Sequence, residues 1–309
     1  MPRVLVTGAS GFVGRHVVDR LSERGDEVVA TGSGDRELEA RRGVRWHQVD
    51  LLNPEAGAAL VARERPTHLV HLAWFSKPGA NWTSLENVRW AEASLGLLRA
   101  FHAAGGERAV FAGTCAEYDW SYGLCSEVRT PTDPASLYGA AKDGLRRVAL
   151  AAAQEGGIGL AWARIFFLYG RHEHPQRLVP AIALPLLRGE PAPCSEGLQM
   201  RDYLHVADAA AALTELLHSP VTGPVNIGSG VPLRVRDLVA GIGDRLGRPD
   251  LVRYGALGDG GAGAAPLVVA DPARLRDEVG WRPQIGLAEG LDDVVSFWRA
   301  VVDGAPAGG

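Results

Sequence analysis

Short apolar runs alternate with longer amphipathic segments along the first half of the chain. Runs of this kind predict buried strands, and amphipathic segments predict helices. The expected strands are 4–6, 27–31, 68–73, 109–112 and 159–167, and helix-like stretches occupy 53–65, 84–104 and 136–155. Strands that alternate with helices build a parallel sheet with helices on both faces. We therefore expect an α/β fold with a doubly wound parallel sheet.

The pattern changes after Phe167, where prolines, glycines and short elements replace the regular alternation. One return to the sheet is expected around 225–228. We predict a sheet domain formed by 1–163 and about 202–232, and a smaller C-terminal domain formed by 164–201 and 233–309. The Gly/Ala-rich segment 255–266 predicts a mobile loop.

Composition and charge narrow the class of protein. The 309 residues are 46% hydrophobic and 22% charged, with a net charge of −4, which is typical of a soluble globular protein. No basic stripe indicates nucleic-acid binding, no apolar run approaches the roughly 18 residues of a membrane span, and the chain lacks the layout of a signal peptide. The three cysteines form no CxxC pair, and the adjacent His-Glu-His residues at 172–174 seldom converge on a metal. We expect a cytoplasmic protein without disulfides or a metal site.

Three glycines follow the first strand at a regular spacing. Gly8, Gly11 and Gly14 form G-x-x-G-x-x-G within TGASGFVG, with Phe12 and Val13 between the last two. Glycines allow the backbone to turn tightly and to approach a pyrophosphate closely. The helix that follows points its free N–H groups and its positive dipole end at that phosphate. The turn therefore predicts a dinucleotide-binding site, and a tight turn without a ligand is the alternative.

The end of the second strand bears on which dinucleotide binds. Proteins that bind NAD usually place an Asp or Glu there to hold the ribose hydroxyls, but this chain has Thr-Gly-Ser-Gly at 31–34. Ser33 and Arg36 suit a 2′-phosphate, because an Arg guanidinium pairs with phosphate through two hydrogen bonds. The pattern favours NADP(H). NAD(H) stays open because Asp35 follows directly, and a solvated loop charge is an equal reading of Arg36.

Tyr138 and Lys142 lie four residues apart on one face of a predicted helix. The chain holds only two lysines, Lys77 and Lys142, against thirty arginines. A nearby ammonium and an oxidised nicotinamide ring both favour the phenolate form of a tyrosine. Lowering the phenol pKa by about three units needs roughly 4 kcal/mol. The pair predicts a group that moves a proton on and off a carbinol oxygen during hydride transfer.

Thr114 lies just beyond the strand at 109–112 and supplies a third polar group. A hydroxyl there is placed to donate to the substrate oxygen and to stabilise its developing charge. A Tyr and a Lys at this spacing are by themselves more often a surface pair. The order of the three groups after the glycine turn favours Thr114, Tyr138 and Lys142 as catalytic residues.

These motifs together resemble the extended branch of the short-chain dehydrogenases/reductases, in particular the members that act on nucleotide sugars. The signature TGxxGxxG is met in full, and the resemblance spans nearly all of the chain. Other matching segments are HLAW at 71–74, RIFFLYG at 164–170, RDYLHVADAA at 201–210, NIGSG at 226–230 and the ending at 280–298. The resemblance implies a Rossmann domain with a smaller C-terminal substrate-binding domain. It also implies a homodimer formed through two helices of each subunit.

The resemblance also assigns residues by their position in the motifs. Five further residues would contact the cofactor, flanking its adenine or lying near its nicotinamide: Asp50, Leu51, Leu72, Ala73 and Phe166. Arg201 would bind the diphosphate or the nucleotide ribose, and Arg177 is a second candidate for that task. An Arg can bind a diphosphate through paired hydrogen bonds. An ion pair of Arg201 with Asp202 or Asp208 is the alternative.

Several positions depart from the family pattern. Phe167 replaces the Asn of Arg-x-x-Asn, and Trp74 replaces a small residue, where it either narrows the nicotinamide side of the pocket or fills a core. Dehydratases of the family carry Asp-Glu after the catalytic Thr, where this chain has Cys115 and Ala116. Glu117 comes one place later, and in an extended segment it would point to the other face. The sequence therefore argues against a 4,6-dehydratase.

The expected function is hydride transfer at C4 of a nucleotide-diphosphate sugar. The missing strand-end carboxylate and the missing dehydratase acids favour a 4-ketoreductase that uses NADPH on a 4-keto-6-deoxyhexose. The alternative is an NAD-dependent 4-epimerase, which oxidises C4 and returns the hydride to the other face. A non-catalytic regulator that binds the cofactor is a hypothesis of a different class, and the intact set of Thr114, Tyr138 and Lys142 argues against it.

Overall fold

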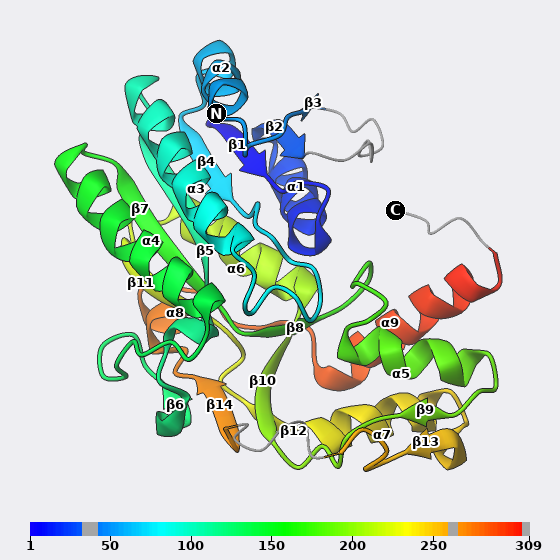
Figure 1. The fold of residues 1–309 in the computed structure, drawn as a ribbon. Coiled ribbons are helices and arrows are strands. Elements are labelled where there is room, and N and C mark those ends of the chain that lie inside the picture. The colour runs from blue at the N-terminus through cyan, green and yellow to red at the C-terminus, as the bar shows by residue number, and fades with distance from the viewer. Residues whose placement is uncertain (33–42, 259–264, 305–309) are drawn as a thin grey trace.

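The main sheet of the protein is parallel throughout. We describe it from a computed structural model, in which the described residues are 1–32, 43–258 and 265–304. Within these residues the sheet has seven strands in the order β11-β7-β5-β4-β1-β2-β3 (Figure 1). The strands are β1 Arg3–Thr7, β2 Glu27–Gly32, β3 Val44–Gln48, β4 His68–His71, β5 Arg108–Thr114, β7 Gly159–Ile165 and β11 Gly223–Ile227. The predicted doubly wound parallel sheet is confirmed.

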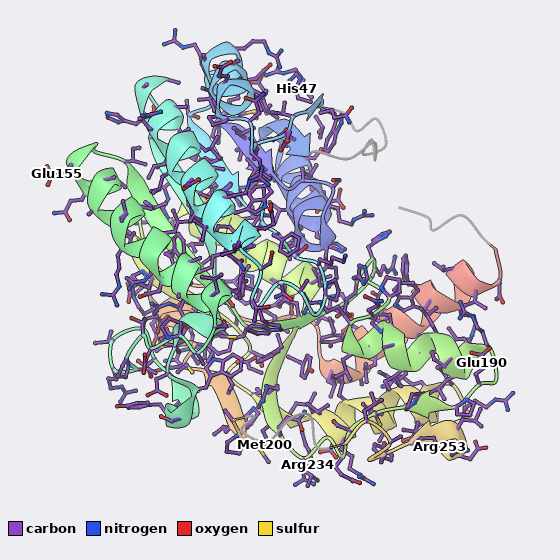
Figure 2. All side chains as sticks on the ribbon, in the orientation of Figure 1. His47, Glu155, Glu190, Met200, Arg234 and Arg253 are labelled. Atoms are coloured by element: carbon purple, nitrogen blue, oxygen red, sulfur yellow. The ribbon has the colours of Figure 1, made fainter. Side chains whose placement is uncertain are left out.

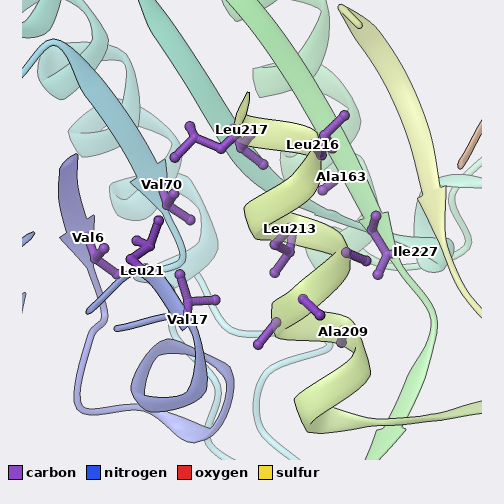
Figure 3. Packing of buried hydrophobic residues seen from close by; sticks show 14 of the residues in the cluster. Val6, Val17, Leu21, Val70, Ala163, Ala209, Leu213, Leu216, Leu217 and Ile227 are labelled. Carbon is purple, nitrogen blue, oxygen red and sulfur yellow. The ribbon is translucent and has the colours of Figure 1, made fainter. Parts of the chain in front are cut away.

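Helices cover both faces of this sheet (Figure 1). One face carries α1 Phe12–Arg24 and α6 Val206–His218, and the other carries α2 Pro54–Glu64, α3 Glu86–Ala103 and α4 Leu137–Glu155. Successive strand residues point to opposite faces, so Val4 and Val6 pack with the first layer and Leu5 with the second. Figure 3 shows Val17 of α1 and Leu213 of α6 in the first layer. The fully buried apolar side chains of both layers hold the strand ends in register for the site.

A smaller set of elements packs beyond the carboxyl end of the sheet. Helices α5 Leu178–Leu187, α7 Val235–Arg245 and α9 Leu287–Val302 share a separate apolar core. A second sheet has the order β12-β10-β14-β6, and β8 also pairs with β10; its strands are β6 Leu124–Cys125, β8 Phe167–Tyr169, β10 Met200–His205, β12 Pro232–Arg234 and β14 Leu267–Ala270. Met200 and Arg234, paired across β10 and β12, lie at the far end of this part (Figure 2). The remaining elements are β9 Ala192–Pro193, paired with β13 Val252–Arg253, the short helix α8 Ala273–Asp277, and the 3₁₀ turns η1 Cys115–Glu117, η2 Trp120–Tyr122 and η3 Pro249–Leu251.

The predicted strand 159–167 is two strands in the structure. β7 ends at Ile165, and β8 begins at Phe167 and pairs with β10 of the second sheet. A continuous apolar run does not reveal that the chain changes partner inside it. The predicted strand 68–73 ends at His71, and the residues after it line the cavity described below. The domain limits stay a prediction, and part of the predicted loop 255–266 lies outside the described residues.

Membrane and metal sites were sought in the described residues. None of their helices is long and apolar enough to cross a membrane. Among them there is also no group of three or more His, Cys, Asp or Glu side chains that could hold a metal ion. The three cysteines are free thiols and all are buried.

Candidate active site

A cavity of about 590 Å³ lies at the carboxyl end of the main sheet. Residues at or just beyond the ends of β1, β4, β5 and β7 line it, as is usual for ligand sites of open parallel sheets. The predicted site residues that line it are Gly8, Gly11, Phe12, Val13, Gly14, Leu51, Leu72, Ala73, Thr114, Tyr138, Lys142, Phe166 and Arg177. Asp50 and Arg201 are not among its lining residues, and Ser33 and Arg36 lie outside the described residues. The fold thus brings the glycine turn and the Thr-Tyr-Lys set to one cavity.

The glycine turn leaves no space for side chains. A Cβ on Gly8, whose φ is +65°, would lie 2.8 Å from the Ala73 nitrogen, and one on Gly14 would lie 2.1 Å from the Gly8 carbonyl oxygen. Gly11 is the N-cap of α1, and no side chain caps that helix end. The first N–H groups of α1 are therefore available to an anion, which fits the pyrophosphate of a dinucleotide.

Gly32, the last residue of β2 and the last described residue before position 43, has no side chain to hold a ribose. Gly32 lines the cavity there, and a Cβ on it would lie 2.9 Å from Ser10 Oγ and 3.1 Å from the Trp46 ring. Asp50 is exposed, and its carboxylate accepts a hydrogen bond from the Leu52 N–H at 3.0 Å. This contact makes Asp50 a residue of the local turn. Leu51, beside it, is the residue that lines the cavity.

Thr114 and Tyr138 meet where two elements pack closely. Thr114 ends β5, and Tyr138 lies in the first turn of α4, whose N-cap Ser136 accepts a hydrogen bond from the Gly139 N–H. A Cβ on Gly139 would lie 2.2 Å from the Ala116 carbonyl oxygen, so α4 can approach η1 only with a glycine there. The resulting proximity lets the Thr114 side chain act on the Tyr138 phenol and lower its pKa.

The phenol of Tyr138 is neutral in this structure. Burial raises the pKa of Tyr138 to about 12, against the hydrogen bond from Thr114 and the positive charge of Arg177, which lower it. The lowered phenol pKa expected from the sequence, which included the charge of an oxidised nicotinamide ring, stays a prediction for the site with its cofactor. The expectation omitted the desolvation of the phenol, which here outweighs the nearby positive charge.

Lys142 is buried on the same wall, with 3% of its surface exposed. Its ammonium donates to the Ala112 carbonyl at 2.7 Å and lies 3.6 Å from the centroid of the Trp74 ring. Burial lowers the pKa of Lys142 to about 7, and the negative charge of Glu117 acts in the opposite direction. The ammonium thus titrates close to neutral pH.

Aromatic rings surround these groups. The Trp82 ring packs edge-on against Tyr138, with centroids 5.7 Å apart, and the Trp82 carbonyl accepts from the Tyr138 N–H at 3.1 Å. Trp74 and Trp120 also line the cavity. Trp74 was expected either to narrow the pocket or to fill a core. In the structure it lines the cavity, and its ring also packs at the edge of the core beside α3. These rings surround the half-buried Tyr138 and the buried Lys142.

Arg177 and Arg201 have different surroundings. Arg201 is buried, donates to the Met200 and Ala265 carbonyls at 2.8 Å each, and lies over the ring of Phe167, 5.6 Å from its centroid. It forms no ion pair with a described carboxylate, so the ion-pair alternative does not match these contacts, and binding of the diphosphate or ribose by Arg201 stays a prediction. Arg177 is exposed at the N-terminus of α5 and lines the cavity. Arg177 is therefore the better placed of the two for an anionic substrate.

Glu117 is directed into the core beneath Thr114. The segment is a 3₁₀ turn, so the predicted extended geometry is wrong, but the carboxylate does point away from the cavity. It is fully buried and accepts from the Thr114 N–H at 2.9 Å, from the Trp162 indole at 2.9 Å and from the Arg164 guanidinium at 2.7 Å. Glu117 thus fixes the end of β5 that carries Thr114.

Among the cavity residues that the sequence reasoning did not assign to the site are two buried polar residues, Glu173 and Asn81. Glu173 is 6% exposed, and Asn81 is 5% exposed. Each has a side-chain oxygen without a hydrogen-bond partner among the described residues: Oε2 of Glu173 and Oδ1 of Asn81. Burial raises the pKa of Glu173 to about 8, while the charge of Arg177 lowers it. The His-Glu-His run at 172–174 was the only sequence signal for Glu173, and Asn81 had none. The burial of both residues depends on tertiary packing, which the sequence pattern does not reveal.

The comparisons with known proteins agree with this geometry. A UDP-glucose 4-epimerase from Mycolicibacterium smegmatis is 28% identical to this chain over an alignment 332 positions long, gaps included. The alignment covers 96% of this chain and 98% of that protein. The structure of a UDP-glucose 4-epimerase from Thermotoga maritima, solved with UDP-glucose, matches with a TM-score of 0.87 at 25% identity, over 97% of this chain and 99% of that one. A dTDP-glucose 4,6-dehydratase from Streptomyces venezuelae, solved with NAD bound, matches with a TM-score of 0.85 at 28% identity, over 98% of each chain.

The model of one enzyme family covers most of the sequence. It is described as the NAD dependent epimerase/dehydratase family, and it matches residues 4–228. That range contains the glycine turn, Thr114, Tyr138 and Lys142. The family was predicted from these motifs, and the prediction is confirmed. The chain is therefore an enzyme of the NAD-dependent epimerase/dehydratase family, within the extended short-chain dehydrogenases/reductases.

Proposed function

We propose that the protein is an NAD-dependent 4-epimerase of a nucleotide-diphosphate hexose. The observation that carries this proposal is the position of Thr114, Tyr138 and Lys142 on the wall of a cavity that the glycine turn also lines. The curated relative in Mycolicibacterium smegmatis and the Thermotoga maritima structure are both UDP-glucose 4-epimerases. These relatives favour the epimerase over the ketoreductase that the sequence pattern favoured.

The residues of this chain divide the work at the cavity. The glycine turn and the N-terminus of α1 would hold the pyrophosphate, and Leu51 would contact the adenine side. When bound, the nicotinamide accepts and returns a hydride at the sugar carbon. Tyr138 takes the proton from the sugar hydroxyl and later gives it back, while Thr114 holds the phenol and the substrate oxygen in place. The cationic groups of Lys142 and Arg177 favour the phenolate during this exchange.

The expected substrate class follows from Arg177 and from the segment after Thr114. Arg177 lies at the N-terminus of α5, where a positive side chain and a helix dipole both favour a diphosphate. Cys115 and Ala116 occupy the positions at which family dehydratases carry acids, and Glu117 is held in the core. The segment after Thr114 therefore presents no carboxylate to the cavity for removing water from the sugar.

A 4-ketoreductase is the second candidate. The observation that favours it is Gly32, since an NAD-dependent enzyme usually has a carboxylate at the end of this strand. An NADP(H) preference would also follow if Ser33 and Arg36 hold a 2′-phosphate. The two candidates differ in how they treat the cofactor, because an epimerase regenerates it in every turnover and a reductase releases it.

The cofactor content of the purified protein separates the two. The protein is purified without added nucleotide and denatured, and the released dinucleotide is identified and counted by chromatography. We expect close to one NAD per chain. A protein that carries no dinucleotide, and that oxidises NADPH in proportion to an added 4-keto sugar nucleotide, is a reductase and overturns the proposal.

A further inference from the structure

Trp74 and Lys142 form the closest cation–aromatic contact that the described residues contain. The Lys142 nitrogen is 3.6 Å from the centroid of the Trp74 ring. Trp74 follows Ala73 at the cavity edge and comes from the loop after β4, whereas Lys142 comes from α4. The contact therefore joins two separate elements across the wall of the site.

The ammonium of Lys142 has few other partners. It donates one hydrogen bond, to the Ala112 carbonyl. Among the described residues no carboxylate lies within ion-pair distance of it, because Glu117 of η1 pairs with Arg164. The other titratable groups that face it are His71 of β4, whose pKa burial lowers to about 3, and Tyr138 on its own helix. Both are neutral near pH 7, and the charge of Glu117 acts on the ammonium only from beyond ion-pair distance, so the indole face and the Ala112 carbonyl are the direct contacts that compensate for the lost hydration.

The Trp74 ring is held in this orientation. Its indole N–H donates to Asn87 Oδ1 at 2.9 Å, and Asn87 is fully buried in α3. The Asn87 amide in turn donates to the carbonyls of Asn81 and Ser84 at 2.8 Å each. A fixed amide thus fixes the plane of the ring, and the ring presents its face to the ammonium.

We propose that Trp74 is the positioning residue of Lys142: its indole face, locked by Asn87, holds the ammonium charged and in place beside Tyr138. The proposal rests on the contacts of Trp74 with Lys142 and Asn87 in this chain. Its consequence for catalysis rests on the proposed function. The protonation of Lys142 does not, because it can be measured on the protein alone.

The scarcity of lysine makes that measurement direct. The chain has two lysines, so protein labelled with ¹³Cε-lysine gives two NMR signals. Lys77 is exposed and does not line the cavity, so Lys77→Arg leaves only the Lys142 signal without touching the site. The Lys142 shift is followed from pH 5 to 11 in this background, with Trp74→Phe and Trp74→Leu compared.

The aromatic face predicts the order of the variants. Trp74→Leu removes the face and keeps the site apolar, so the Lys142 pKa falls by about 0.5–1.5 units. Trp74→Phe keeps a weaker face, so the fall is smaller. An unchanged or raised Lys142 pKa in Trp74→Leu overturns the proposal.

Fluorinated tryptophan tests the same point without risk to the fold. Fluorine withdraws electrons from the ring face and hardly changes its shape, so each added fluorine should lower the Lys142 pKa further. In the Trp74→Phe variant the same labelling replaces only the other tryptophans and should leave Lys142 unchanged. An effect of equal size in both proteins contradicts the proposal.

Activity supplies a separate readout. In Trp74→Leu, the limb of the kcat/KM pH profile that reports Lys142 should move with the NMR pKa. If the NMR shift appears but neither protein turns over any nucleotide sugar, the proposed function fails and the role of Trp74 stands. If activity is present and its profile does not move with the NMR pKa, the catalytic consequence fails.

Discussion

Tyr138 is subject to two opposing effects at the scale of a single residue. Burial raises its pKa to about 12, and the Thr114 hydroxyl and the charge of Arg177 act against this. The phenol is therefore ready to donate a proton, and it needs the positive charges of the complete site before it can accept one. We therefore expect substitution of Tyr138 to lower turnover more than substitution of any other residue of the site.

Tyr138→Phe should lower turnover by about 10²–10⁴-fold, because the proton transfer at the sugar oxygen loses its group. The ring packing against Trp82 is kept, so the fold and the cofactor content should not change. Tyr122 is 57% exposed and outside the cavity, so Tyr122→Phe is the matched control. Turnover assays on both variants check this, and full activity in Tyr138→Phe would revive the non-catalytic regulator.

Glu173 predicts a pH dependence of substrate binding. Its pKa is raised to about 8 by burial, so the carboxyl is neutral below that pH and negative above it. A negative charge beside a diphosphate substrate is repulsive. The KM for the nucleotide sugar should therefore rise about three- to tenfold between pH 7 and 9.

Glu173→Gln keeps the shape of the side chain and removes the titration, so its KM should stay flat over the same range. Glu190 is exposed, and Glu190→Gln is the control that should keep the rise. Steady-state kinetics across this range decide the point. If KM rises equally in Glu173→Gln, another group causes the rise, and the prediction for Glu173 is wrong.

Which residues could be predicted from sequence depends on how local their signal is. Gly8, Tyr138 and Lys142 are recognisable because a turn or one helical repeat fixes their relation to their neighbours. The burial of Glu173 and the orientation of Trp74 result from contacts between distant segments, which spacing does not reveal. The raised pKa of Tyr138 was missed for the same reason.

At the scale of elements, the turn after β1 and the start of α1 pack closely. Gly14 lies in the first turn of α1, directly against the Gly8 carbonyl. Any side chain there pushes the helix N-terminus away from the strand end. The cofactor position depends on this packing, since the N–H groups of α1 are the expected phosphate ligands.

Gly14→Ala should lower dinucleotide affinity by at least tenfold and destabilise the protein by about 1–3 kcal/mol, because the added methyl overlaps backbone atoms. Gly144 is exposed on α4, and nothing lies within 4 Å of a Cβ there. Gly144→Ala should therefore stabilise the protein by up to about 1 kcal/mol. Urea unfolding and cofactor titration measure both changes, and equal effects at the two positions would contradict this account.

Elements were predicted best where a long segment repeats the hydrophobic spacing of a helix. The helix-like stretch 136–155 became α4 at Leu137–Glu155, and 53–65 became α2 at Pro54–Glu64. The run 159–167 failed at Phe166, where the chain leaves the main sheet to line the cavity. A change of sheet leaves no trace in a run that is apolar throughout.

At the scale of the whole molecule, we propose that two copies pair through α3 and α4. Val88 of α3 is 43% exposed and Val148 of α4 is 53% exposed, on the helices of one face of the sheet. Exposed aliphatic side chains on neighbouring helices are often covered by a partner. A second copy fits this face because two helices from each chain can pack as a four-helix unit.

Val148→Glu should convert the dimer to a monomer, since it places a charge in the proposed apolar contact. Light scattering after gel filtration gives the mass directly. Val302→Glu changes a valine of α9 that is 36% exposed and should leave the dimer intact. A wild-type protein that is monomeric at micromolar concentration would contradict the proposed pairing.

The central claim is that this cavity inverts C4 of a nucleotide hexose with a cofactor it keeps. The most direct test is proton NMR of the protein with UDP- and dTDP-hexoses and no added nucleotide. The account predicts that one sugar nucleotide and its C4 epimer reach the same final ratio from either side, and that Tyr138→Phe abolishes this. No interconversion of any hexose tested, together with stoichiometric oxidation of NADPH by a 4-keto sugar nucleotide, would contradict it.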